Sequence, residues 1–222
     1  TPDDVRYGTV GKPLPEVSVR IAPDGEIEIR SRKIFAGYHK APELTEAVLP
    51  SAQAPDAGWF KTGDIGFIDD DGFIHITDRK KDLIVTSGGK NIAPQKIESL
   101  AQAISGASAW ISQIVVLGDR RPYLVALMTL NREEVIQVAS EKGILFSEYA
   151  ELIRNPKILS MTQSVIDRIN SDLGKVETIK KFMILPHEFT VASGELTPSL
   201  KVKRKVIEAR YAKDIETLYG AS

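Results

Sequence analysis

The chain of 222 residues contains no cysteine, which excludes disulfide bonds, thiolate metal sites and a cysteine nucleophile. It also lacks an excess of charge of one sign, because 29 Lys and Arg residues stand against 30 Asp and Glu residues. This balance argues against a protein dedicated to binding nucleic acid. Aromatic residues are few, at 7%, whereas the hydrophobic content of 42% is ordinary for a globular protein.

Long apolar runs are missing as well. The longest covers residues 124–130, far short of the roughly 20 residues that a transmembrane helix needs. No basic and apolar leader opens the sequence. These features predict a soluble protein, and the absence of cysteine permits a reducing compartment. The first residue is Thr1 and not methionine, so we expect a fragment of a longer protein.

The sequence pattern changes near residue 80, and the change predicts two parts. The first part has strand-like segments separated by turn signals, together with one short helical segment. The second part alternates strands with longer helices whose apolar residues recur at helical spacing, so we expect an α+β protein. The expected strands are residues 17–21, 26–30, 67–68, 73–76, 111–117, 123–130 and 180–185, and the expected helices are residues 42–49, 94–104, 131–142, 156–173 and 203–218.

The segment WFKTGD at residues 59–64 predicts a tight turn followed by an aspartate. One interpretation is an Asx turn, in which Asp64 bonds its own backbone. The other is that a carboxylate held on a turn accepts hydrogen bonds from two vicinal hydroxyls, as acidic residues do for a ribose.

Three consecutive aspartates, Asp69 to Asp71, precede Gly72 and raise the question of calcium. An EF-hand loop needs an acidic or amide ligand five residues before the glycine and a glutamate at its end. Phe67 and Asp78 occupy those two positions. We therefore favour a solvated hairpin turn and expect no metal site.

The segment SGGKN at residues 87–91 contains a Gly-Lys pair, as phosphate-binding loops do. That loop also needs glycine where Ile84 stands and serine or threonine where Asn91 stands, so a phosphate loop is excluded. Two interpretations remain for Gly88 and Gly89: a plain hairpin turn, or a turn on which backbone approaches a ligand closely.

Four of the five residues from Lys201 to Lys205 are basic. Binding to nucleic acid or anionic lipid is one hypothesis, and a solvated basic helix face is the other. No aromatic residue is interleaved to stack on bases. The three histidines, His39, His75 and His187, lack metal-ligand spacing and are expected to be structural.

Taken in order, these segments resemble the C-terminal part of the adenylate-forming superfamily, which contains acyl-CoA synthetases, peptide-synthetase adenylation domains and luciferases. The resemblance covers nearly the whole chain, and its forms are most similar to the long-chain fatty acyl-CoA synthetases. The segments that carry it are GTVGKP at 8–13, GEIEIR at 25–30, WFKTGD at 59–64, TDRKKD at 77–82, GGKNIAP at 88–94 and LTPSLKVKRK at 196–205.

The resemblance implies a fold and domain boundaries. Residues 1–80 would be the β-rich C-terminal piece of the large AMP-binding domain. Residues 81–222 would be the mobile C-terminal domain, a small α+β domain with a mixed sheet flanked by helices. The family's phosphate loop, magnesium-binding Thr-Glu motif and acyl pocket would precede Thr1, so the rest of the N-terminal domain would be a partner in the same polypeptide. We expect the 222 residues alone to be inactive.

The resemblance also implies a reaction: ATP activates a fatty acid to an acyl-adenylate, and CoA then takes the acyl group. ATP, CoA and Mg²⁺ would be the cofactors, with the Mg²⁺ site outside this chain. Asp64 and Arg79 would bind the nucleotide ribose, and Lys201 would be catalytic.

Three further roles follow from the same resemblance. Lys81 would be the hinge, Gly88 and Gly89 would line the passage for the pantetheine arm of CoA, and Glu98 would have a supporting role. Leu200 replaces the glycine that the family has before its catalytic lysine.

Two alternatives stay open: transfer of the acyl group to a carrier-protein thiol, or a basic module that binds nucleic acid or membrane. For the ligase we expect a cytoplasmic location, no nucleic-acid partner, and compatibility with peripheral membrane contact.

Overall fold

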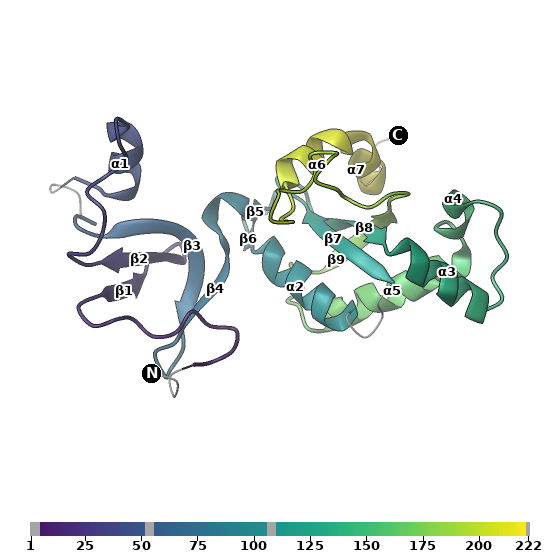
Figure 1. Cartoon of the computed structure of the whole chain (residues 1–222), viewed down its shortest axis with the longest axis horizontal. Helices are drawn as coiled ribbons and strands as arrows, with labels where there is room; N and C mark the ends of the chain where they lie inside the picture. The colour runs from purple at the N-terminus through teal and green to yellow at the C-terminus, as the bar shows by residue number, and fades with distance from the viewer. Residues whose placement is uncertain (1–4, 52–55, 106–109, 221–222) are drawn as a thin grey trace. The chain divides into compact units, whose positions relative to one another are not determined.

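The computed structural model describes residues 5–51, 56–105 and 110–220. The chain divides into two compact units, Thr1–Leu83 and Ile84–Ser222. Each unit contains both strands and helices (Figure 1), and the α+β class predicted from the sequence is confirmed. The assignment of each part to a named domain stays a prediction.

The first unit is built on a four-stranded antiparallel sheet in the order β1-β2-β3-β4. Its core is small, and the buried hydrophobic side chains among its described residues are Ile27, Phe73 and Ile74. The elements are β1 (Ser18–Ile21), β2 (Glu26–Arg30), α1 (Pro42–Val48), β3 (Phe60–Ile68), β4 (Ile74–Arg79) and the 3₁₀ turn η2 (Lys80–Asp82).

Strand β2 and helix α1 lie where the sequence predicts them, but β3 and β4 are longer than expected. The predicted two-residue strand at 67–68 is the end of a nine-residue strand. The segment WFKTGD, expected to be a turn, lies mostly within that strand. Glycine and aspartate disfavour strands on propensity alone, and here the pairing with β2 and β4 outweighs that preference.

The second unit has a three-stranded mixed sheet, in which β8 pairs antiparallel with β7 and parallel with β9. Every residue of the central strand β8 is buried. The elements are β5 (Ile84–Val85), β6 (Asn91–Ile92), α2 (Pro94–Ser105), β7 (Ile111–Leu117), β8 (Leu124–Leu130), α3 (Arg132–Glu141), α4 (Tyr149–Leu152), α5 (Pro156–Ser171), β9 (Ile179–Ile184), α6 (Arg204–Arg210) and α7 (Ala212–Tyr219).

Helices cover both faces of this sheet (Figure 1). On one face Ile114 and Val116 pack with α2, α3 and α5, and on the other Val115 and Leu117 pack with α6 and α7. Alternate residues of a strand point to opposite faces, which explains why neighbours on β7 belong to different cores. The mixed sheet flanked by helices is therefore confirmed.

The C-terminal segment differs from its prediction. The single helix expected at 203–218 is two helices, α6 and α7, separated at Tyr211. The Tyr211 ring is buried, and its hydroxyl donates to Glu195 Oε1 at 2.8 Å. We attribute the break to this anchoring, which helical periodicity does not reveal.

No helix among the described residues is both long and apolar enough to cross a membrane.

Candidate functional site

Strand β3 is irregular around Asp64. The β2 residues paired with Lys61 and Ile65 are only two positions apart, so three residues of β3 face one residue of β2. Gly63, in this bulge, has a φ of 72°, which glycine adopts without steric cost. Thr62 Oγ1 donates to a β2 carbonyl at 2.7 Å and accepts from the Asp64 N–H at 3.1 Å. Bulges of this kind re-aim side chains beside functional sites.

Asp64 lies opposite Arg79 on the neighbouring strand β4. Arg79 Nη1 is 2.8 Å from Asp64 Oδ1, and the two side chains are 53% and 18% exposed respectively. The structure thus brings together the two residues that the sequence analysis placed at a nucleotide ribose. A charge-assisted pair at the surface retains oxygen and nitrogen atoms for a polyhydroxy ligand.

A buried carboxylate contacts the sequence neighbours of both residues of this pair. Glu26 on β2 is 3% exposed. Its Oε1 accepts the Gly63 N–H at 2.8 Å, and its Oε2 lies 2.7 Å from Lys80 Nζ. Lys80 Nζ also lies 2.7 Å from Asp24 Oδ2. The hydrogen bonds that the Lys80 ammonium donates, first to Asp24 and then to Glu26, raise the pKa of Lys80 above its ordinary value.

Lys81, the predicted hinge, lies in the short 3₁₀ turn η2 directly after β4, and it is exposed. The Leu83 N–H donates to the Lys80 carbonyl and closes this turn at 3.4 Å. The two compact units divide immediately afterwards, between Leu83 and Ile84. The position is that of a connecting segment, and the hinge role itself stays a prediction.

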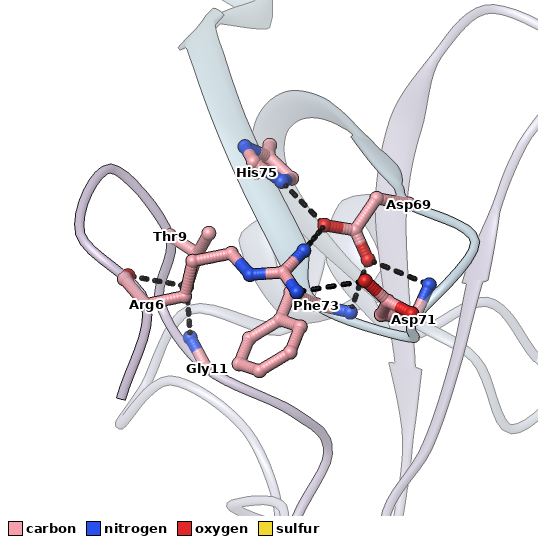
Figure 2. Close-up of polar contacts among 7 residues, drawn as sticks. All are labelled: Arg6, Thr9, Gly11, Asp69, Asp71, Phe73 and His75. Atoms are coloured by element: carbon pink, nitrogen blue, oxygen red, sulfur yellow. Dashed lines mark hydrogen bonds and ion pairs between the residues drawn. The ribbon is translucent and has the colours of Figure 1, made fainter. Parts of the chain in front are cut away.

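The aspartate-rich loop is a hairpin turn between β3 and β4, as favoured from the sequence (Figure 2). Asp69 Oδ1 accepts the backbone N–H groups of Asp71 and Phe73, at 3.1 and 2.8 Å. Arg6 binds Asp69 at 2.8 Å and Asp71 at 2.7 Å, and His75 Nε2 lies 3.0 Å from Asp69 Oδ2. The acidic loop is thus engaged by basic side chains of the same unit.

This cluster has an electrostatic signature. The neighbouring His75 is the main cause that lowers the pKa of Asp69 to about 2, with further lowering by the Phe73 backbone N–H and by Arg6. The Arg6 guanidinium also lies over the Phe73 ring, 4.2 Å from its centroid (Figure 2). Together these contacts attach the segment around Arg6 to the β3–β4 hairpin.

Gly88 and Gly89 lie in the turn that joins β5 to β6. The Gly89 N–H donates to the Thr86 carbonyl at 2.9 Å, and the Thr86 N–H donates to the Lys90 carbonyl at 3.0 Å. Gly89 has a φ of 72°, and a Cβ there would meet nothing within 4 Å. The segment is a hairpin turn, which fits both interpretations, and a ligand-facing role for its exposed glycine backbone stays a prediction.

Glu98, on α2, forms a two-point ion pair with Arg204 at the start of α6, at 2.8 and 3.0 Å. Both groups also bind the backbone of Val116 on β7: its N–H donates to Glu98 at 2.7 Å, and its carbonyl accepts from Arg204 at 2.6 Å. The side chains are 15% and 13% exposed. This arrangement ties the helix after the glycine turn to the helix after Lys201.

Lys201 lies in a short hairpin closed by the bridge between Leu196 and Val202. The Leu200 N–H donates to the Thr197 carbonyl, and the Thr197 N–H donates to the Lys201 carbonyl, both at 2.8 Å. The Lys201 side chain is exposed and forms no hydrogen bond or ion pair with a described residue. It is therefore accessible to a ligand.

The basic run does not form one helix face. Lys201 lies in the hairpin, Lys203 caps α6, and the helix itself begins at Arg204. Arg204 forms an ion pair with Glu98 and donates a hydrogen bond to the Val116 carbonyl on β7. The helix-face interpretation is wrong because the bridge between Leu196 and Val202 places Lys201 in the hairpin, and α6 begins only at Arg204.

The predicted residues fall into two groups. Asp64, Arg79 and Lys81 belong to the first unit, and Gly88, Gly89, Glu98 and Lys201 belong to the second. Sequence reasoning missed Glu26, Lys80 and Arg204. Strand alternation predicts that Glu26 faces water, and no local signal links it to a lysine 54 residues away.

A family model described as the AMP-binding enzyme C-terminal domain matches residues 81–222. The long-chain-fatty-acid–CoA ligase FadD15 of Mycobacterium tuberculosis is 42% identical over 220 residues, 98% of this chain and 35% of the relative. The long-chain-fatty-acid–CoA ligase heimdall of Drosophila melanogaster is 33% identical over 88% of this chain and 33% of its own length. The chain thus spans about a third of the length of these relatives.

Solved structures agree with this likeness. The adenylation domain of a carboxylate reductase from Mycobacterium chelonae has a TM-score of 0.68 and 25% identity, over 94% of this chain and 31% of that one. The corresponding domain from Segniliparus rugosus, in complex with AMP and a co-purified carboxylic acid, has a TM-score of 0.66, with 25% identity over 94% of this chain and 32% of that one. The chain belongs to the AMP-binding, adenylate-forming enzyme family, and its residues 81–222 match the family's C-terminal domain.

Proposed function

We propose that this chain is the C-terminal part of a long-chain fatty-acid–CoA ligase. In the first step a fatty carboxylate attacks the α-phosphate of ATP, which forms acyl-adenylate and releases pyrophosphate. In the second step the CoA thiol attacks the acyl carbon and releases AMP. The observation that carries the proposal is 42% identity to a ligase of this class along 98% of the chain.

In the first step Asp64 and Arg79 hold the ribose. The Asp64 carboxylate accepts hydrogen bonds from the ribose hydroxyls, and Arg79, 2.8 Å away, keeps it oriented. Lys201 brings a positive charge to the α-phosphate and the attacking carboxylate, where negative charge accumulates during transfer. Its accessible ammonium group, which no described carboxylate neutralises, supports this role.

In the second step a different segment of the second unit lies at the reaction centre. Rotation at Lys81 withdraws Lys201 and brings the turn of Gly88 and Gly89 to the reaction centre, where it lines the pantetheine passage. The small exposed glycine turn and the Glu98–Arg204 pair, which stiffens the frame beside it, support this assignment.

The family implies Mg²⁺ with ATP. Among the described residues no group of three or more His, Cys, Asp or Glu side chains is placed to hold a metal ion. None of the described residues is therefore assigned to Mg²⁺.

A second candidate is transfer of the acyl group to a carrier-protein thiol. It is favoured by the likeness to the didomain of adenylation domain and carrier protein of a carboxylic acid reductase, with a TM-score of 0.66. The enzyme with bound acyl-adenylate is incubated with CoA and, separately, with a phosphopantetheinyl carrier protein. The acceptor that becomes acylated distinguishes the ligase from the carrier-protein activity.

The test of the ligase proposal is a chimera in which these 222 residues replace the matching region of the M. tuberculosis FadD15 ligase. We expect palmitate, ATP and CoA to give palmitoyl-CoA, AMP and pyrophosphate, and we expect the 222-residue chain alone to give none. A soluble chimera without product would contradict the proposal. Salt-sensitive binding of the chain to DNA or anionic vesicles near physiological salt would instead favour the basic-module hypothesis.

Lys201→Ala in the chimera should abolish adenylation, with a loss of about a hundredfold or more, and leave thioester formation from supplied acyl-adenylate largely intact. Lys205→Ala, at a lysine on α6 that is also exposed, is the matched control and should change neither step. Pyrophosphate release and acyl-CoA formation, measured separately, check this. An equal loss of rate in both half-reactions would contradict the role proposed for Lys201.

A further inference from the structure

Glu26 is a charged residue in the small core of the first unit. It is 3% exposed, on β2, beside buried Ile27. Burying a carboxylate is costly unless charges and hydrogen bonds compensate. Its two oxygens meet this requirement in different directions, one toward Gly63 and the other toward Lys80.

The contact with Gly63 lies inside the bulge of β3. There the ladder with β2 is interrupted, and the Gly63 N–H donates to Glu26 Oε1 at 2.8 Å. Gly63 directly precedes Asp64. The carboxylate of Glu26 therefore stabilises the backbone conformation that determines where Asp64 points.

The contact with Lys80 lies at the end of β4. Lys80 directly follows Arg79, the partner of Asp64, and directly precedes Lys81. The carboxylates of Glu26 and Asp24 both bind its ammonium group at 2.7 Å. Lys80 is thereby attached to the sheet, whereas Lys81 is exposed.

We propose that Glu26 is a positioning residue for nucleotide binding: through Gly63 and Lys80 it holds both members of the Asp64–Arg79 pair in register. This inference rests on the proposed function, in which that pair binds the ribose. A second consequence is that the movable segment begins after Lys80, because Lys80 is anchored to the first unit.

The same strand offers a matched control. Glu28 lies two residues further along β2, is also 3% exposed, and forms an ion pair with Arg20 at 2.6 Å. Its side chain is not hydrogen-bonded to Gly63 or Lys80. Replacing Glu26 or Glu28 by glutamine removes a buried carboxylate in either case, but only the first change affects the two flanking residues.

Glu26→Gln cannot keep both contacts. Its single carbonyl oxygen accepts from Gly63 or from Lys80, and the amide NH₂ then faces the other donor. We expect hydrogen exchange of the Gly63 amide in the 222-residue chain to accelerate by about tenfold or more in Glu26→Gln and to stay unchanged in Glu28→Gln. Equal exchange in the two variants would overturn the link between Glu26 and the bulge.

A second experiment measures the effect of the same substitutions on the activity of the chimeric ligase. Glu26→Gln should raise the KM for ATP about tenfold, the equivalent of one lost charge-assisted hydrogen bond, without changing the KM for CoA or fatty acid. Lys80→Met should act in the same direction, and Lys80→Arg, which keeps the charge, should restore the KM. Glu28→Gln should leave all three KM values unchanged. An unchanged KM for ATP in Glu26→Gln would overturn the positioning role.

The two failures are distinguishable. An inactive wild-type chimera contradicts the ligase proposal, while the exchange of Gly63 still decides whether Glu26 holds the bulge. An active chimera whose ATP affinity responds equally to Glu26→Gln and Glu28→Gln contradicts the positioning role and leaves the ligase proposal standing.

Discussion

At the scale of single residues, Leu200 has an unusual backbone. Its φ is 60°, and its side chain is 68% exposed. The Leu200 N–H closes a four-residue turn on the Thr197 carbonyl, and the left-handed Leu200 stands where a G1 bulge has a glycine. A leucine there carries steric strain that exposed packing does not offset.

Leu200→Gly should therefore raise the free energy of unfolding by about 0.5–1 kcal/mol, because relief of the left-handed strain exceeds the added chain entropy of glycine. Denaturant unfolding of the 222-residue chain measures this. Leu145→Gly, at an exposed leucine outside the positive-φ residues, should be neutral or destabilising. A loss of stability in Leu200→Gly would show that the leucine makes a favourable contact.

Asp69 is the second residue whose surroundings predict a measurable effect. Its pKa is lowered to about 2 from the ordinary value of 3.8, so the folded state favours the ionised carboxylate. A lowered pKa contributes stability above the unfolded pKa, and the contribution is lost as the pH falls through the folded value. The pH window of the loss is therefore about 4 to 2.

Asp69→Asn should be less stable than the parent above about pH 4, and the difference should shrink towards pH 2. Thermal unfolding across this range checks the prediction. Asp70→Asn is the control, since the Asp70 carboxylate makes no hydrogen bond or ion pair with a described residue. A difference between Asp69→Asn and the parent that is independent of pH would contradict the electrostatic explanation.

At the scale of elements, strand β3 shows how pairing overrides local preference. A strand of nine residues contains Gly63 and Gly66 and a bulge, features that lower strand propensity. Gly66 is required, because a Cβ there would lie 2.0 Å from the His75 carbonyl oxygen on β4. The close approach of the two strands depends on that missing side chain.

The turn η2 is the element on which the proposed movement depends. Lys81→Pro restricts φ at residue 81 and disfavours the helical conformation of Lys80 before it. In the chimera we expect the thioester step to slow more than adenylation. The two half-reactions, measured separately, check this, and unchanged CoA transfer would argue against a hinge at Lys81.

At the scale of the whole molecule, the two units differ in buried apolar side chains. The second unit has two hydrophobic cores, one on each face of its sheet. The first unit buries few hydrophobic side chains among its described residues and exposes several large ones, including Tyr7, Leu14, Leu44 and Phe67. Hydrophobic burial is the dominant source of stability, so the first unit should be the weaker one.

Limited proteolysis of the 222-residue chain should therefore remove the first unit and leave a resistant fragment that begins near Ile84. Mass spectrometry of the products over time identifies its ends. Degradation of both units at the same rate would show that they unfold as one cooperative body.

Local sequence patterns are sufficient to predict the family and most elements of the second unit. Periodic apolar residues predict its helices, and Asn131 caps α3 as expected, accepting from the backbone N–H groups of residues 133 and 134. Such features depend on neighbours within one or two turns of chain. The ordered segments that resemble adenylate-forming enzymes are equally readable from the residues alone.

The pairing of polar groups, by contrast, depends on the packing of segments that are far apart in the sequence. Glu26 reaches Gly63 and Lys80, 37 and 54 residues away, and Glu98 reaches Arg204, 106 residues away. It also decided that Leu200 takes a left-handed backbone and that the last helix breaks at Tyr211. The physical reason is that strand register and long-range ion pairs depend on the packing of distant segments, about which local periodicity carries no information.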